Sequence, residues 1–295
     1  MTFDAFLKTA WNDHAERTDE VADRLSAALP LLTAPENIAP FTRLATHVFG
    51  EHLGQWQRGI ALLEALRGLP SYAGNAAAAV AVATNIAVLR FVSGDAAALR
   101  ALLHEDRVAA LATASAAFAG RTDFRQAIAC YEAALREARD GLPAGSAAHR
   151  ALAIGGNNLA CELEQKMDRD DNETRGMVVG AEGALEYWKL AGTWLEEERA
   201  EYRLTRSLLK ARQPAPAIAS AGRCVAVCRA NDAPPFEQFF AYAVLALARR
   251  AAGEQEAAAA AQSLARQMYA QVPEDERQWC ADDLAELEAQ EPVAS

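Results

Sequence analysis

The chain has 295 residues, a length that suits one large domain or two ordinary ones. Hydrophobic residues make up 52% of it and charged residues 23%, which excludes an intrinsically disordered chain. The formal net charge of −11 argues against direct binding of nucleic acid, which requires a basic surface.

The N-terminal segment, residues 1–35, is predicted to form a helical cap. Residues 2–29 have the pattern of one or two amphipathic helices, and proline-containing linkers follow at Leu29-Pro30 and Ala34-Pro35. The first residues lack the apolar run of a signal peptide. We therefore expect no signal peptide here.

Residues 36–272 contain turn signals that recur after apolar helical stretches. Alanine, the best helix former, is the commonest residue, and strand-like alternation of Val, Ile and Thr is absent. Several of the turns are about forty residues apart, which is the length of two antiparallel helices with short connections. The turns are Leu53-Gly54-Gln55, Ser93-Gly94-Asp95, Ala119-Gly120-Arg121, Ala211-Arg212-Gln213-Pro214 and Ala252-Gly253-Glu254. We predict an all-α fold in which glycines end helices in the left-handed conformation and Asp95 or Asp123 caps the next helix.

One stretch of this region, residues 76–92, is the nearest candidate for a membrane span. It is dominated by alanine and interrupted by Asn85 and Arg90. We expect no membrane insertion.

The clearest repeat unit runs from Leu111 to Leu135. Small and aromatic side chains lie on one face of each of its two predicted helices, at Ala114, Ser115, Phe118, Ala127, Tyr131 and Ala134. This spacing resembles the tetratricopeptide repeat. The same frame fits residues 42–66, 86–99, 157–191 with an acidic insertion at 168–173, 204–224 and 244–264. The resemblance implies an α-solenoid of about five or six irregular antiparallel helix pairs in a right-handed superhelix.

The C-terminal segment, residues 273–295, is predicted to cap the repeats. Residues 273–289 have the pattern of a final acidic helix, and residues 291–295 are expected to form a frayed tail.

The resemblance also implies which side chains face the concave surface of the solenoid. Arginine and lysine there would attract acidic groups, asparagine would hydrogen-bond a peptide main chain, and tyrosine would offer a flat contact. The expected partner-binding residues are Asn85, Asn157, Asn158, Arg199, Tyr202, Arg203, Arg206, Lys210, Tyr242 and Arg249. The alternative is a solvated face whose cations are neutralised by the neighbouring Glu196, Glu197, Glu198 and Glu201.

Candidate metal and catalytic groups are sparse. His47 and Glu51 would share a helix face, with His52 pointing elsewhere, so we interpret all three as ordinary surface or packing residues. Asp168, Asp170 and Asn172 match the start of a calcium loop poorly, and a solvated acidic loop is expected.

Cys224 and Cys228 lack further zinc ligands and are predicted to be buried. Five cysteines at irregular spacing favour reduced thiols and a cytoplasmic location. We predict no metal and no cofactor.

The sequence thus favours a non-catalytic protein-interaction scaffold that binds a peptide or helix, preferably acidic, in its groove. Two alternatives remain open. One is an effector-sensing regulator that acts with a transcription or signalling partner, as similar repeats do in bacterial transcription factors. The other is an enzyme that joins His47, His52 or His104 to carboxylates. No phosphate loop, nucleophile elbow or metalloprotease motif supports it.

Overall fold

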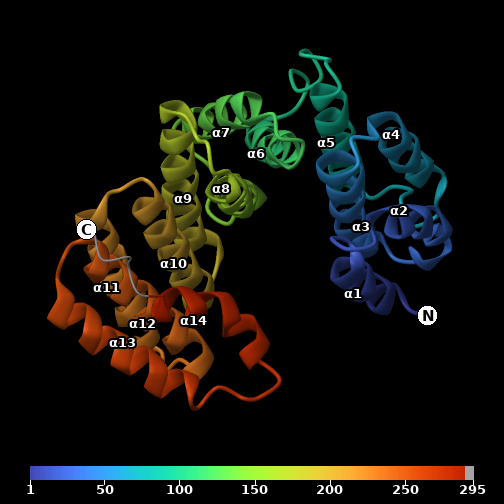
Figure 1. Ribbon diagram of the computed structural model, residues 1–295. Coiled ribbons are helices and arrows are strands. Elements are labelled where there is room, and N and C mark those ends of the chain that lie inside the picture. Colours follow the sequence, from blue (N-terminus) through green and yellow to red (C-terminus); the bar gives the residue numbers. More distant parts are fainter. Residues whose placement is uncertain (290–295) are drawn as a thin grey trace. The chain divides into compact units, whose positions relative to one another are not determined.

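The computed structural model describes residues 1–289, and all regular structure within that range is helical (Figure 1). It contains fourteen α-helices, several short 3-10 segments and one π-helical turn, with no strand among the described residues. The all-α class predicted from the sequence is confirmed. None of the helices within 1–289 combines the length and apolar character needed to cross a bilayer.

The chain forms two compact units, residues 1–162 and the residues from 163 onward. One helix, α8 (Ala147–Gln165), runs through the division between them. The division falls inside a helix and not in a proline- or glycine-rich linker, which is why the sequence predicted no boundary here.

The first unit is built mainly around α5 (Ala76–Val92), which packs against α3, α4 and α6. The other elements are α1 (Phe3–Asp13), α2 (Thr18–Ala27), α3 (Ile38–Thr46), the π turn (His47–His52), α4 (Trp56–Ala65), α6 (His104–Gly120) and α7 (Phe124–Ala138). The largest fully buried side chains of its core include Phe6, Leu25, Phe41, Leu44, Phe49, Leu63 and Leu89. Residues 2–29, where one or two helices were expected, form α1 and α2.

Helices α6 and α7 form the antiparallel pair predicted for residues 111–135. The small side chains Ala114, Ser115, Ala127 and Ala134 are buried where the helices meet, and so is Tyr131. At the start of α7, the Asp123 side chain accepts a hydrogen bond from the Gln126 amide, which confirms the predicted cap.

The turn between these two helices differs from the prediction. Gly120 stays helical, and Thr122 takes the left-handed conformation at φ 61°. Gly120 is instead a point of close approach, since a Cβ there would lie 2.8 Å from the Glu51 carbonyl oxygen. Gly54, Gly94 and Gly253 do adopt the predicted positive φ.

Residues 96–102 do not form the second helix expected for the 86–99 unit. They form turns, and Leu99 is the one buried side chain among them. A segment this short with a single buried side chain lacks the apolar stripe that holds a surface helix in place.

The second unit is a succession of helices, and consecutive helices among the first five pack together. They are α9 (Asp171–Ala191), α10 (Trp194–Lys210), α11 (Pro214–Ala230), α12 (Pro235–Ala251), α13 (Gln255–Tyr269) and α14 (Ala281–Glu288). Small side chains such as Ala217, Ala221, Ala261 and Ala265 are buried between them and allow close packing.

The predicted C-terminal helix is shorter than residues 273–289. A 3-10 segment, Arg277–Cys280, precedes α14, and α14 also packs against α12. The frayed tail expected at residues 291–295 lies outside the described residues.

Candidate functional site

The predicted basic face lies along α10 in the second unit. The helix begins at a capping box, in which the Thr193 side chain and Glu196 satisfy each other's backbone amides. From there, spacings of three and four place Arg199, Arg203 and Arg206 along one side of the helix. Lys210 is exposed at its C-terminal end.

Each of the three arginines pairs with a carboxylate of the same unit. Arg199 binds Glu237 of α12 at 2.6 Å, and Arg203 binds Glu164 at 2.6 Å. Arg206 binds Glu286 of α14 at 2.5 Å. Since all three guanidinium groups already have acidic partners, the face recognises carboxylates within its own chain.

The C-terminal helix α14 brings several of these acidic groups. The Tyr202 hydroxyl donates a hydrogen bond to Asp283 at 2.5 Å, next to the pair between Arg206 and Glu286. Leu287 is fully buried on the same helix. Burial, together with the charge of Asp283, raises the pKa of Tyr202, so its hydroxyl remains a donor.

Helices α12 and α13 hold the far end of α14. Arg250 and Gln262 both donate to the Leu287 carbonyl, at 2.7 and 2.9 Å. Arg250 also reaches the Ala289 carbonyl, and Arg266 lies 3.6 Å from the Glu288 carboxylate. Arg250, Gln262 and Arg266 therefore extend the predicted cationic surface onto α12 and α13, and the sequence analysis did not identify Gln262 and Arg266. Gln262 and Arg266 lie four residues apart on α13, which places them on one side of the helix, but their contacts on α14 are distant in sequence.

Two further predicted residues are engaged elsewhere in the second unit. Tyr242 is 7% exposed, and its hydroxyl accepts hydrogen bonds from Arg229. Arg249 forms an ion pair with Glu254 in the turn after α12. The flat surface expected of Tyr242 is thus covered.

The neighbouring glutamates do not all neutralise the cations in the expected way. Glu201 is fully buried and binds Arg223 of α11 at 2.7 Å rather than an arginine of α10. Glu198 is buried as well and accepts a hydrogen bond from the Cys224 thiol at 3.1 Å. These two side chains lie on the core side of α10, so the neutralising groups come from Glu164, Glu237 and α14.

The three predicted asparagines belong to the first unit. Asn85 donates to Thr42 and to the Ala81 carbonyl, both within that unit. Asn158 lies 3.5 Å from the Glu51 carboxylate, and Asn157 is half-buried. The amide groups of Asn85 and Asn158 are thus directed at their own chain.

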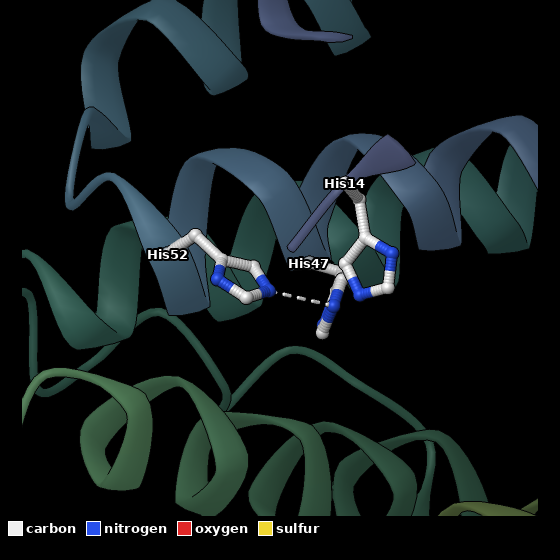
Figure 2. Close-up of side chains that lie close together, drawn as sticks. All are labelled: His14, His47 and His52. Atoms are coloured by element: carbon white, nitrogen blue, oxygen red, sulfur yellow. Dashed lines mark hydrogen bonds between the residues drawn. The ribbon is translucent and has the colours of Figure 1, made fainter. Parts of the chain in front are cut away.

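The histidine cluster is where the structure contradicts the sequence interpretation. His47 and His52 were expected to point apart, but their ring nitrogens lie 3.0 Å apart, and His14 stands beside them (Figure 2). Residues five apart on an α-helix are separated by about 140°. The segment His47–His52 is a π turn instead, and a hydrogen bond from the Leu53 amide to the Val48 carbonyl widens it. This widening brings the first and last residues of the turn to the same side.

Nearby groups fix the cluster further. His47 Nδ1 lies 2.7 Å from a Glu51 carboxylate oxygen, and Arg121 donates to the His52 carbonyl. Burial, together with the neighbouring His47, lowers the pKa of His52 to about 4, so its ring is neutral at pH 7. Sequence reasoning missed His14 because it follows α1, more than thirty residues upstream.

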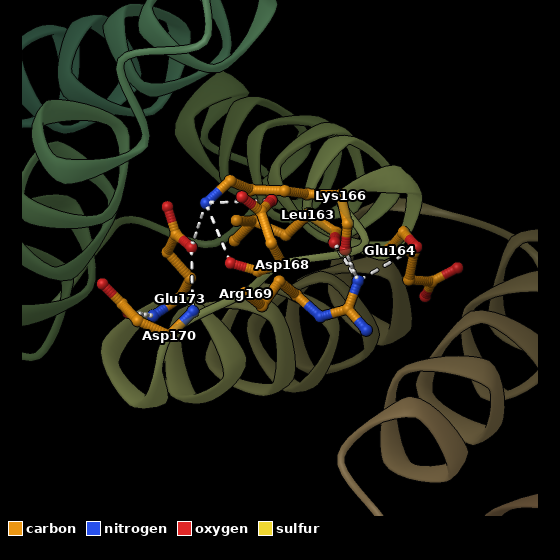
Figure 3. Close-up of polar contacts among 7 residues, drawn as sticks. All are labelled: Leu163, Glu164, Lys166, Asp168, Arg169, Asp170 and Glu173. Carbon is orange, nitrogen blue, oxygen red and sulfur yellow. Dashed lines mark hydrogen bonds and ion pairs between the residues drawn. The ribbon is translucent and has the colours of Figure 1, made fainter.

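The acidic insertion 168–173 is a helix-capping device (Figure 3). Asp170 and Glu173 form a capping box at the start of α9, so residues from Asp171 onward are helical rather than loop. Lys166 binds Glu173 at 2.6 Å, and Arg169 donates to the Leu163 carbonyl at the end of α8. The acidic side chains thus serve the local backbone and Lys166.

Cys224 and Cys228 are buried, as predicted. Burial raises the pKa of both thiols, so they are protonated at neutral pH and are poor metal ligands or nucleophiles.

No protein-family model matches this sequence, and a search among curated proteins finds no significant relative.

Proposed function

We propose that the second unit is a non-catalytic binding module for an acidic, amphipathic helix of a partner protein. The partner would bind the face made by α10, α12 and α13, where α14 lies in this structure. One observation carries the proposal, namely the way in which this face holds α14.

The chemistry of α14 defines the kind of partner. Its acidic side chains Asp283, Glu286 and Glu288 contact Tyr202, Arg206 and Arg266. Its apolar side chains Leu284 and Leu287 join the core cluster of the unit. A helix with leucines on one side and carboxylates beside them would satisfy both parts of the surface.

The length of α14 makes exchange with a partner feasible. An isolated helix of eight residues is not stable in water, so α14 depends on its contacts with this face. A longer partner helix with the same pattern can form more of these contacts and displace it. In this arrangement α14 acts as an internal competitor.

The test compares the full chain with a chain that ends at Cys280. A labelled peptide with the sequence of residues 281–295 should bind the shortened chain at least about tenfold more tightly than the full chain. Arg206→Glu and Arg266→Glu in the shortened chain should each weaken binding by about tenfold, because they replace attraction by repulsion. The matched control is Arg175→Glu, the same charge change on α9, where Arg175 contacts Asn172.

The same proteins can then capture partners from a native lysate. Partners retained by the shortened chain, released by the peptide and lost on Arg206→Glu would identify the protein that uses this face. Equal peptide binding by the shortened chain and its two face variants, with circular dichroism unchanged, would overturn the proposal.

A further inference from the structure

The first unit holds three imidazoles that converge from two separate segments. His14 follows α1, and His47 and His52 begin and end the π turn. One nitrogen of each ring lies within 4.8 Å of the others, and the ring centroids are 4.6 to 5.2 Å apart. Figure 2 shows the three rings gathered in one place.

The hydrogen bonds of two of these rings indicate which ring nitrogen donates to the protein and which one could bind a metal ion. His14 Nδ1 lies 2.5 Å from the Trp11 carbonyl oxygen, which can only accept, so this nitrogen carries the proton. His47 Nδ1 faces the Glu51 carboxylate and donates to it in the same way. In each of these two rings Nε2 is thus the nitrogen that remains to bind a metal ion, and in His47 it lies 3.0 Å from His52 Nε2. In metal-bound histidines, one ring nitrogen usually donates to a carbonyl or a carboxylate while the other binds the metal ion.

The surroundings hold the rings in place without sealing them. The Trp11 ring packs against His47 at 5.1 Å between centroids. The absence of a side chain at Gly120 lets α6 approach the π turn at Glu51. The side chain of His47 retains 18% exposure, and that of Glu51 retains 13%. An ion can therefore reach the cluster from solvent.

We propose that His14, His47 and His52 bind one divalent transition-metal ion, with Zn²⁺ as the best match. A set of three imidazoles suits zinc and its neighbours in the first transition row, whereas calcium and magnesium require oxygen ligands. Three protein ligands leave one position of a tetrahedral zinc ion for water or an external ligand. Glu51 is a positioning residue, because it orients the His47 ring and does not itself supply a ligand.

The experiment measures Zn²⁺ binding to the full chain, purified without a histidine tag, by competition with a chromophoric chelator. We expect one equivalent per chain with a Kd at or below about 1 μM. His14→Gln, His47→Gln and His52→Gln should each weaken binding by about tenfold to hundredfold, and so should Glu51→Gln. Co²⁺ added to the wild-type chain should give the intense visible absorption of a tetrahedral site.

The matched control is His104→Gln, in the same unit. His104 bonds the Glu137 carbonyl and lies outside the cluster, so its replacement should leave Zn²⁺ affinity unchanged. The proposal is overturned if the wild-type chain binds less than one equivalent of Zn²⁺ when the free Zn²⁺ concentration is tenfold above the expected Kd of about 1 μM. It is equally overturned if folded His52→Gln protein binds Zn²⁺ as tightly as wild type, which would leave the rings as a hydrogen-bonded cluster alone.

Discussion

The Glu198 carboxyl lies in the interior of the second unit, where it is 1% exposed and faces Glu237, Arg199 and the Cys224 thiol. Burial raises its pKa to about 8, and the nearby Glu237 adds to the rise while the hydrogen bond from Cys224 opposes it. In the unfolded chain the same group would titrate near its ordinary value of 4.5. Above that pH the unfolded chain releases a proton that the folded chain keeps.

The free energy of unfolding should therefore fall as the pH rises from about 4.5 to about 8 and then level off. Glu198→Gln removes this titration while it keeps a polar side chain of the same shape. We expect the variant to be more stable than wild type by about 2–4 kcal/mol at pH 8 and nearly equal to it at pH 5. Urea unfolding of both proteins at the two pH values measures this. An equal difference at pH 5 and pH 8 would show that Glu198 is ionised in the folded protein.

Glycines inside helices have opposite roles in the two units. A Cβ at Gly155 of α8 would lie 2.7 Å from the Ala112 carbonyl oxygen of α6, whereas a Cβ at Gly222 of α11 would meet nothing within 4 Å. The first glycine permits a backbone contact, and the second only lowers helix propensity.

Gly155→Ala should therefore destabilise the chain by about 1–3 kcal/mol, because the helices must separate. Gly222→Ala should stabilise it by about 0.5–1 kcal/mol. Thermal or denaturant unfolding followed by circular dichroism tests both. A stabilised Gly155→Ala variant would mean that α6 and α8 do not approach this closely.

At the scale of elements, the connection from α8 to α9 depends on its caps. Asp170 accepts the Glu173 amide at 2.8 Å, while the Asp168 side chain is 88% exposed and 3.7 Å from Lys166. Asp170→Ala should lower the free energy of unfolding by about 1 kcal/mol. Asp168→Ala should change it by less than about 0.5 kcal/mol, since exposed ion pairs contribute little. Urea unfolding distinguishes the two variants, and equal losses would contradict the capping role.

The π turn is the element that brings His47 and His52 together and so allows the histidine cluster to form. The sequence His47-Val-Phe-Gly-Glu-His52 has no marker that separates a π turn from an α-helix. The packing of Glu51 against Gly120 and the hydrogen bond from Arg121 to the His52 carbonyl both come from α6 and its end. Contacts this distant in sequence override local helix geometry.

At the scale of the whole molecule, the two proposed sites lie in different compact units. In these proposals metal binding would order α1 and the π turn, and release of α14 would expose α10, α12 and α13. We expect Zn²⁺ to slow amide hydrogen exchange at residues 14 and 47–53 and to leave the second unit unchanged. Removal of residues 281–295 should speed exchange in α10, α12 and α13 and leave residues 47–53 unchanged. Changes that cross from one unit to the other would show that the sites are coupled.

The sequence by itself determined the helical class and much of the helix placement. The helix pair predicted at residues 111–135, the cap at Asp123 and the buried small side chains all follow from patterns that neighbouring residues establish. It also located Arg199, Tyr202, Arg203 and Arg206 on one face, because residues three and four apart share a side of a helix.

The tertiary structure alone decided what these side chains contact. Tyr202 meets Asp283 across 81 positions of the chain, and His14 meets His47 across a loop and two helices. Such pairs depend on how α14 docks and how α1 and the π turn pack, and no local period of the sequence encodes them. Helical periodicity fixes the side of a helix on which a residue lies, whereas the burial of leucines and phenylalanines far apart in the chain fixes which sides meet.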